Sequence, residues 1–469
     1  MAEVKPQRLH PAALVLAAGR SLRELLVPLV LGGGIAATGP GSGIGVIGVT
    51  ALGLVAAAGL GFASWRATTW EVSEGEVRLR SGIVQRSLIE VPLERVEALD
   101  TTRGPIQRLF GVVGVRIQAA GGGKAPEIVL GALSDEALTA LRTAIERSGA
   151  GAATPADNAP AFPARALGAR GMVVAALTAG QLGAIVPLLV AASQLADDVL
   201  GPKAGETVEG LLPTGAAEAV LAAGGLLGVA WILSIAGSVI AFARFRVTRE
   251  PQRLRITRGL LSRHESSVPV GRVLAVRIVE GILRQPFGLA SVRVETAGYG
   301  AEAAIRTTLF PLLPRDQIPA LLDELLPELA PTTLELEGLP ARARRRYLVV
   351  PIAAGLTVAA VAALIDPAAG AVAIAVPLVL GLWGWFRFRA AGSELREGRL
   401  ALRFRRLART TMVVRPGCVD LRTLSVNPLQ RRAALASFEI GLASKGTARV
   451  SHLDAGTARS LAARLATAP

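Results

Sequence analysis

The sequence has few of the residues on which metal centres, redox sites and disulfides depend. Its 469 residues include one cysteine, three histidines and two tyrosines. The lone cysteine, Cys418, excludes an intrachain disulfide framework and a cysteine-based zinc site. The histidines, His10, His264 and His452, lie too far apart in the chain to form a local metal motif. We therefore expect no cofactor and no metal.

Charged residues are also missing from long stretches of the chain. None lies between Leu25 and Trp65, and one helix of that length would be about twice as long as the hydrocarbon core of a bilayer, which is about 30 Å thick. We expect this run to fold back at Gly39–Gly43, where glycine and proline predict a turn. Further apolar pairs lie within residues 165–243 and 347–386. The sequence thus predicts six transmembrane helices in three hairpins.

The arginines around these hairpins predict how the chain is oriented. The formal net charge is +15 and the mean hydropathy is +0.47. In a soluble chain such a charge suggests a nucleic-acid partner, but in an apolar chain it typically reflects basic cytoplasmic flanks. Basic residues lie outside the three hairpins, whereas the turn of the second hairpin carries acids such as Asp197 and Glu206. We therefore expect a multi-pass protein with both termini in the cytoplasm, and no nucleic-acid partner.

Two stretches, VPLERV from Val91 and VPVGRV from Val268, open longer segments that are copies of each other. The residues shared at an offset of 177 positions are Pro92, Arg95, Phe110 and Gly111 in the first copy and Pro269, Arg272, Phe287 and Gly288 in the second. A further offset of 146 finds a third, diverged copy, which has Arg415, Cys418, Ala433 and Ala434 at these positions. Repeats this widely spaced are whole domains.

Each copy follows the same expected plan of strands closed by one helix. Short runs rich in β-branched residues and punctuated by glycine predict antiparallel strands. An amphipathic helix then begins near Ser134, Asp316 or Asp454. This order predicts a small α+β domain, in which one helix closes a β-sandwich or barrel. We expect the apolar Phe110 and Phe287 to lie in the domain cores.

These patterns set the expected domain boundaries. They are residues 1–65 for the N-terminal segment and first hairpin, 66–148 for the first domain, 149–164 for a linker, 165–243 for the second hairpin, 244–330 for the second domain, 331–346 for a linker, 347–386 for the third hairpin and 387–469 for the third domain.

The arrangement of these motifs resembles a known family. Two apolar spans precede each strand-rich unit, VPLERV or VPVGRV lies within it, and RLFG (residues 108–111) or QPFG (residues 285–288) precedes a later strand. On these motifs the chain resembles the membrane-flanked bacterial pleckstrin-homology (PH) domain family, YdbT-like proteins in particular. The opening Arg8-Leu9-His10-Pro11 is similar to the start of many members. The resemblance implies PH-like folds, a location in the bacterial plasma membrane, a smaller single-domain PH-like membrane protein as a partner, and no enzymatic activity.

The third copy carries most of the excess positive charge. Lys and Arg exceed Asp and Glu by 0, 4 and 11 in residues 66–147, 244–330 and 387–469. The candidate contacts for anionic phospholipid or a protein partner are Arg396, Arg399, Arg403, Arg405, Arg406 and Arg409. Cations at the cytoplasmic leaflet attract anionic headgroups by about 1 kcal/mol each. Alternatively, these arginines form a solvated face that only contributes to the topology signal.

No catalytic motif is evident in the sequence. Gly43–Gly48 fits the G-x-G-x-x-G string of dinucleotide sites, but no strand precedes it, and Gly121–Lys124 lacks the remaining residues of a phosphate loop. We therefore predict a non-enzymatic scaffold that presents three cytoplasmic PH-like domains to a protein partner and to anionic lipid. The alternative is an accessory component of envelope defence or export that moves or excludes an amphipathic peptide or lipid. It is motivated by glycine-rich spans that contain Pro28, Pro187 and Pro377.

Overall fold

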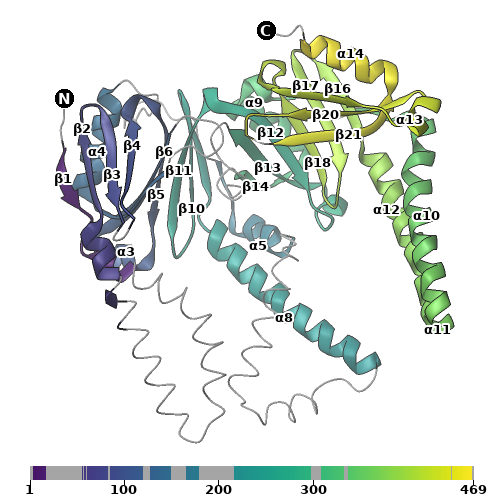
Figure 1. The fold of residues 1–469 in the computed structure, drawn as a ribbon, viewed down its shortest axis with the longest axis horizontal. Coiled ribbons are helices and arrows are strands. Elements are labelled where there is room, and N and C mark those ends of the chain that lie inside the picture. Colours follow the sequence, from purple (N-terminus) through teal and green to yellow (C-terminus); the bar gives the residue numbers. More distant parts are fainter. Residues whose placement is uncertain are drawn as a thin grey trace, which may run out of the picture. The chain divides into compact units, whose positions relative to one another are not determined.

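A computed structural model shows the fold of the chain. It describes residues 4–16, 55, 58–59, 61–82, 85–119, 127–148, 165–178, 216–296, 308–331, 336–444 and 446–466. These residues fall into two compact units, unit 1 up to Pro269 and unit 2 from Val270 onward. Figure 1 shows the strands of unit 1 in purple to teal and those of unit 2 in teal to yellow.

Unit 1 begins with a four-stranded antiparallel sheet formed by the N-terminal segment and the first repeat. The order is β1-β2-β3-β4, with bounds Val4–Arg8, Thr69–Ser73, Glu76–Ser81 and Ser87–Pro92. Buried residues alternate with partly exposed ones along β2, because one face of the sheet covers the core. Glu74 and Gly75 form the turn between β2 and β3 with φ of 55° and 81°, which suits a tight hairpin.

A second sheet of unit 1 combines strands from two repeats. Its order is β7-β6-β5-β11-β10-β9-β8. The bounds are β5 Val96–Arg103, β6 Val112–Ala119, β7 Glu127–Ser134, β8 Arg165–Ala166, β9 Arg246–Glu250, β10 Arg253–Arg258 and β11 Arg263–Pro269. β5 of the first repeat pairs antiparallel with β11 of the second, with Arg103 opposite Arg263 and Thr101 opposite Glu265. We call this pairing junction one.

Unit 2 repeats this construction with the second and third repeats. Its seven-stranded sheet has the order β14-β13-β12-β18-β17-β16-β15. The bounds are β12 Val273–Glu280, β13 Leu289–Thr296, β14 Thr308–Pro314, β15 Glu337–Gly338, β16 Gly392–Arg396, β17 Arg399–Arg405 and β18 Arg409–Val414. β12 pairs antiparallel with β18, from Ala275 opposite Val414 to Glu280 opposite Arg409. We call this pairing junction two.

The third repeat ends in a separate three-stranded sheet of unit 2. Its order is β19-β20-β21, with bounds Leu421–Ser425, Leu435–Gly441 and Thr447–Asp454. The shorter helical segments of both units are η1 Leu93–Arg95, α3 Pro105–Leu109, η3 Val270–Arg272, η4 Gln285–Phe287, η6 Arg315–Gln317, η7 Pro327–Leu329, η8 Pro416–Cys418 and α13 Pro428–Arg432.

One amphipathic helix follows the last strand of each repeat, as predicted. These helices are α4 Asp135–Arg147, α9 Ile318–Leu325 and α14 Ala455–Ala466. In unit 1, Leu141 of α4 joins the core that contains Trp70. In unit 2, Leu461 of α14 joins the core that contains Phe438. Burying such a side chain contributes about 1.5–3 kcal/mol, so each helix completes the core that its strands leave open.

Two helical segments of unit 2 are long and apolar enough to cross a membrane, among the residues that the structure describes. They are Ala341–Ile365, which is α10, and Pro367–Ala390, which contains α11 Pro367–Ala373 and α12 Ala375–Ala390. Few of their residues are buried, whereas most residues of a core helix in a soluble protein are buried. Gly384 allows close packing, because a Cβ there would lie 2.2 Å from the Tyr347 carbonyl oxygen.

The structure tests the other predicted spans less completely. α8 covers Ala216–Phe242 and therefore coincides with the second helix of the predicted second hairpin. α5 covers Ala169–Leu177, at the start of the first helix of that hairpin. The first predicted hairpin, residues 25–65, lies almost wholly outside the described residues. The number of six spans thus stays a prediction.

The repeat signature includes a backbone position that needs a positive φ. Gly111 and Gly288 both have φ of 62°, and Ala434 has φ of 52° at the same position of the third repeat. The expected core position of the neighbouring phenylalanines is wrong, since Phe110 is 43% and Phe287 is 72% exposed. Phe110 follows the short helix α3 and Phe287 ends η4, and the left-handed glycine then turns the chain into the next strand. The glycine of the repeat signature therefore has a structural role, since it adopts the positive φ that this turn requires.

Candidate functional site

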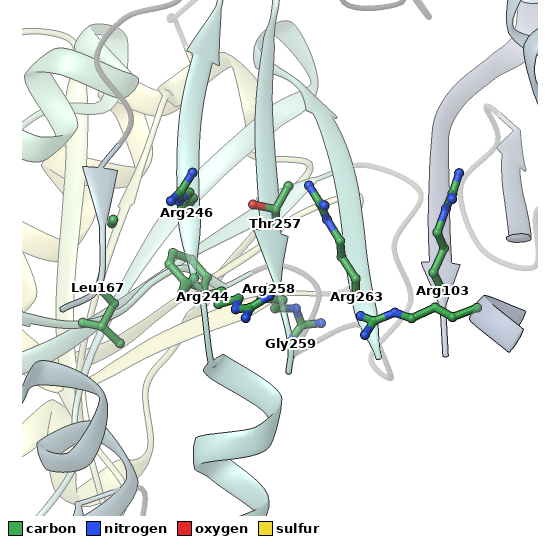
Figure 2. Close-up of a pocket in the computed structure, with 11 residues that line it drawn as sticks. Arg103, Leu167, Arg244, Arg246, Thr257, Arg258, Gly259 and Arg263 are labelled. Carbon is green, nitrogen blue, oxygen red and sulfur yellow. The ribbon is translucent and has the colours of Figure 1, made fainter. Parts of the chain in front are cut away.

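Four neighbouring strands of unit 1 place arginines at the same end of the seven-stranded sheet. Because neighbours are antiparallel, β9 and β11 begin where β10 and β5 end. The residues at these four strand ends are Arg246, Arg263, Arg258 and Arg103, and Figure 2 shows them on adjacent strands.

This end of the sheet lies beside the C-terminal end of α8. The helix ends at Phe242 and β9 begins at Arg246. The loop after β10 is tied to the helix, because the N–H of Gly259 donates to the Ala243 carbonyl at 2.7 Å and that of Leu260 donates to the Ile240 carbonyl at 3.0 Å. The strand-end arginines therefore surround the point where the chain leaves an apolar helix.

These arginines line a cavity of about 730 Å³, which we call the arginine pocket. Its six arginines are Arg103, Arg108, Arg244, Arg246, Arg258 and Arg263, and its other lining residues are Ala166, Leu167, Phe245, Thr257 and Gly259. No acidic side chain is among these lining residues. The size lies within the range typical of small-ligand pockets, about 300–1,000 Å³.

Several of the pocket arginines pair with no acidic side chain among the described residues. Arg103 forms an exposed ion pair with Asp135, and the guanidinium of Arg258 lies 6.0 Å from the centre of the Phe242 ring. In the parts of the chain that the structure describes, no acidic side chain pairs with Arg108, Arg244, Arg246 or Arg263. Like charges repel one another in such a cluster. An anion with several oxygen acceptors would relieve this repulsion and accept charge-assisted hydrogen bonds.

Junction two carries different residues at the equivalent positions. The repeat offsets match Arg103 with Glu280, Arg108 with Gln285 and Arg263 with Arg409. The Glu280 side chain is 2% exposed and accepts two hydrogen bonds from Arg409, the one from Nε at 2.8 Å. The Oε1 atom of Gln285 accepts a hydrogen bond from Arg405 at 2.8 Å. At junction two, Arg405 and Arg409 thus find their hydrogen-bond acceptors within the protein itself.

The same contacts involve part of the six-arginine set predicted from the sequence. Arg409 and Arg405 bind Glu280 and Gln285, as above, and burial lowers the pKa of Arg405, as does the nearby Arg409 charge. The Nε of Arg403 donates to the Ala390 carbonyl at 2.9 Å. These three arginines join β17 and β18 to neighbouring elements of unit 2.

Of the other three predicted arginines, Arg399 is partly buried and Arg396 and Arg406 are exposed. Arg399 donates to the Pro327 carbonyl at 2.9 Å. Arg396 is exposed and lies 3.8 Å from a Glu397 oxygen. Arg406 is exposed too. A lipid or partner contact by these residues stays a prediction.

Exposed apolar side chains accompany these sheet ends in each repeat. Leu109 in α3 is 81% exposed, Phe287 in η4 is 72% exposed and Leu429 in α13 is 50% exposed. In unit 2 the loop after β17 touches an apolar helix, because the Trp383 Nε1 atom donates to the Arg406 carbonyl at 3.0 Å. Exposed apolar groups beside the ends of such helices fit a membrane interface better than water.

Sequence reasoning missed the arginine pocket. Its residues come from two repeats, and the first repeat has no net charge. A signal was available in the aligned copies, where Arg103 and Arg108 replace an acid and an amide, Glu280 and Gln285. Only the strand pairing shows that these positions lie beside the arginines of the next repeat.

Comparison with known proteins confirms the family resemblance. The family model for the bacterial PH domain matches residues 25–148, 185–329 and 348–468. The UPF0699 transmembrane protein YdbT of Bacillus subtilis (strain 168) is 27% identical, over 97% of this chain and 95% of that protein. No solved structure matches the chain. Each matched segment contains one of the three repeats together with apolar residues that precede it. The relative and the two exposed apolar helices together support a membrane location.

Proposed function

Because this chain belongs to the bacterial PH domain family, we propose that it is a non-enzymatic membrane scaffold whose arginine pocket binds the anionic headgroup of a phospholipid. The observation that carries this proposal is the difference between the two junctions. Six arginines line the pocket at junction one, whereas Glu280 and Gln285 satisfy the arginines at junction two. An external anion supplies at junction one what the protein supplies at junction two.

The position of the pocket favours a lipid as the source of the anion. We place six transmembrane helices in the bacterial plasma membrane, with both termini and all three domains in the cytoplasm. α8 then spans the membrane and ends at the cytoplasmic surface, so that Arg244 and Arg246 lie at headgroup depth. Each cation there contributes about 1 kcal/mol to the attraction of anionic lipid. The exposed Leu109, from the short helix α3, lies on the same side of the sheet and would enter the interface.

Two further contacts belong to this proposal. The exposed Arg396 and Arg406, with the rest of the predicted set in the third repeat, would add attraction to the anionic leaflet. A smaller single-domain PH-like membrane protein would be a second partner of the scaffold.

The test uses the full-length protein, purified in detergent and freed of lipid. Arg103→Glu combined with Arg108→Gln copies the residues of junction two, where Glu280 lies opposite Arg409. The change should preserve the sheet, because junction two shows that these residues are compatible with the pairing. We expect binding of phosphatidylglycerol, measured by native mass spectrometry, to fall by at least about tenfold, since the net charge of the pocket falls by three. Binding of phosphatidylcholine should not change.

The matched control replaces exposed arginines of the third repeat. Arg396→Gln with Arg406→Gln removes two charges outside the pocket, so phosphatidylglycerol binding should fall by less than about threefold. A larger loss of binding in the third-repeat variant than in the pocket variant would assign the lipid contact to the third repeat and reject the pocket. Titration with inorganic phosphate forms a third arm. Equal affinity for free phosphate and for the lipid would show that the pocket takes a soluble anion instead.

A further inference from the structure

Among the residues that the structure describes, two strands occupy junction positions without a junction partner. β4 of the first repeat is equivalent to β11 and β18, and β19 of the third repeat is equivalent to β5 and β12. The inner strands pair with each other at junctions one and two. β4, by contrast, ends the four-stranded sheet and β19 ends the three-stranded sheet. Within the described residues, the outer edges of β4 and β19 pair with no strand.

The side chains of these two edges are more exposed than their counterparts at the junctions. All five residues of β19 are exposed, whereas five of the eight residues in β12 are buried. Leu88 on β4 is 53% exposed, and Leu424 on β19 is 40% exposed. An edge with unpaired backbone groups and exposed apolar side chains is a template for another strand. The fold therefore presents one half of a junction at each of two places.

The two known junctions have the same register. At junction one Arg103 faces Arg263, and at junction two the equivalent residues, Glu280 and Arg409, face each other. Carrying this register over to β19 and to β4 of a second copy gives three informative pairs. Leu421 would face Val91, Arg422 would face Glu90 and Leu424 would face Leu88.

These pairs are chemically complementary. Opposite charges and apolar side chains that face each other stabilise antiparallel strands. Arg422 would meet the carboxylate of Glu90, which already lies 3.1 Å from Arg78 of its own copy. Leu424 and Leu88, both exposed in the single chain, would cover each other. The inner junctions have neither pair at these positions, since Val276 faces Val413 and Ile278 faces Thr411 at junction two.

We propose that β19 of one chain pairs with β4 of a second copy, in the register of the inner junctions. The contact is head to tail, so repetition gives a closed ring or an open row along the membrane, depending on the rotation at each contact. The inference rests on the scaffold role proposed above but not on lipid binding. A second copy is the favoured occupant because each free edge carries the residues that complement the other.

The test mixes two full-length forms in one membrane, both with Cys418→Ser to remove the native thiol. One form carries Leu424→Cys and one tag, and the other carries Leu88→Cys and a second tag. Side chains directly opposite in an antiparallel pair have Cβ atoms about 4.5–5.5 Å apart. We therefore expect an oxidised product that contains both tags. Ile89→Cys in place of Leu88→Cys is the register control, because a one-residue shift points the thiol to the other face of the sheet.

A charge exchange tests which strands meet. Arg422→Glu in the first form should reduce the yield of linked product about fivefold, since like charges then face each other. Glu90→Arg in the second form should restore the yield. Absence of the two-tag product, equal product with Ile89→Cys, or a lack of rescue would overturn the proposal, and a different protein bound to either edge would do so as well.

The lipid measurement keeps this proposal separate from the proposed function. Arg422 and Glu90 are not among the residues that line the arginine pocket. Arg422→Glu should therefore leave phosphatidylglycerol binding unchanged. Cross-linking without phosphatidylglycerol binding would reject the proposed ligand but support the contact between copies. Phosphatidylglycerol binding without cross-linking would support the ligand but reject the contact.

Discussion

Junction one, in unit 1, and junction two, in unit 2, pair equivalent strands in the same register, but the side chains at their ends differ. Arg103 faces Arg263 at junction one, whereas Glu280 faces Arg409 and binds it at junction two. The two arginines of the first pair repel each other. The second pair is an ion pair between opposite charges and is largely buried. One strand position thus decides whether the arginine at the end of the sheet meets a carboxylate or another arginine.

The comparison also shows how a repeated domain can specialise. The strand pairing needs only backbone groups and apolar side chains, so it tolerates either charge at the end of the sheet. A cluster of several like charges lowers the stability of the fold, and such a loss is common at functional sites. Junction two has the stabilising ion pair between Arg409 and Glu280.

The largest expected effect separates the two junctions by stability. Glu280→Gln leaves the partly buried Arg409 without its carboxylate, and breaking a buried ion pair costs about 3–5 kcal/mol. Because the side chain of Arg409 is still 25% exposed, we expect a loss of about 3 kcal/mol in the free energy of unfolding. Differential scanning fluorimetry in detergent should show a Tm lower by several degrees.

The control is the equivalent residue of junction one. Arg103→Gln removes an ion pair whose side chains are 44% and 58% exposed, so the free energy of unfolding should change by less than about 1 kcal/mol. Equal effects of Arg103→Gln and Glu280→Gln would mean that the two junctions do not differ in the way described.

A smaller effect tests whether the backbone is the same at both junctions. Gly111→Ala and Gly288→Ala should each lower the free energy of unfolding by about 1–2 kcal/mol, because both positions have φ of 62°. No neighbouring atom lies within 4 Å of a Cβ at either site, so the backbone conformation alone causes the loss. Chemical denaturation should give similar losses for the two variants.

The third repeat offers the reverse substitution. Ala434 adopts φ of 52° at the equivalent position, so Ala434→Gly should raise the free energy of unfolding by up to about 1 kcal/mol. A destabilised Ala434→Gly protein would contradict the assigned equivalence.

The smallest effect concerns pH. Burial lowers the pKa of His452, and the charges of Arg346, Arg387 and Arg449 lower it further. The unfolded chain therefore binds a proton at a higher pH than the folded chain does, so this contribution to stability is present above the ordinary histidine pKa of about 6.5 and is lost as pH falls below it. Thermal unfolding at pH 7.5 and 5.5 should show this loss.

His452→Asn provides the control for that measurement. Asparagine does not titrate, and it tolerates the φ of 60° found at this position, so the difference between the two pH values should shrink. Lipid binding at junction one should remain flat over the same range, because arginines stay charged there. A parallel pH dependence of both properties would show that they are coupled.

Much of the fold was predictable from local patterns. The offsets of 177 and 146 identified three domains, and the closing helices lie where amphipathic periodicity placed them. The exposure of Phe110 was not predictable in this way, because whether an apolar side chain beside a short helix is buried depends on which elements the fold packs against it. The candidate site was missed because it is shared between repeats.

By itself, the sequence determined the number of domains, their strand-and-helix order and the apolar helices. Each of these depends on residues that are close in the chain or on a repeat of the same pattern. Only the tertiary structure decided which charges are paired, because antiparallel pairing brings Arg103 beside Arg263 and Glu280 beside Arg409. Electrostatic energy depends on distance in space, and residues more than a hundred positions apart acquire that distance only when the sheets form.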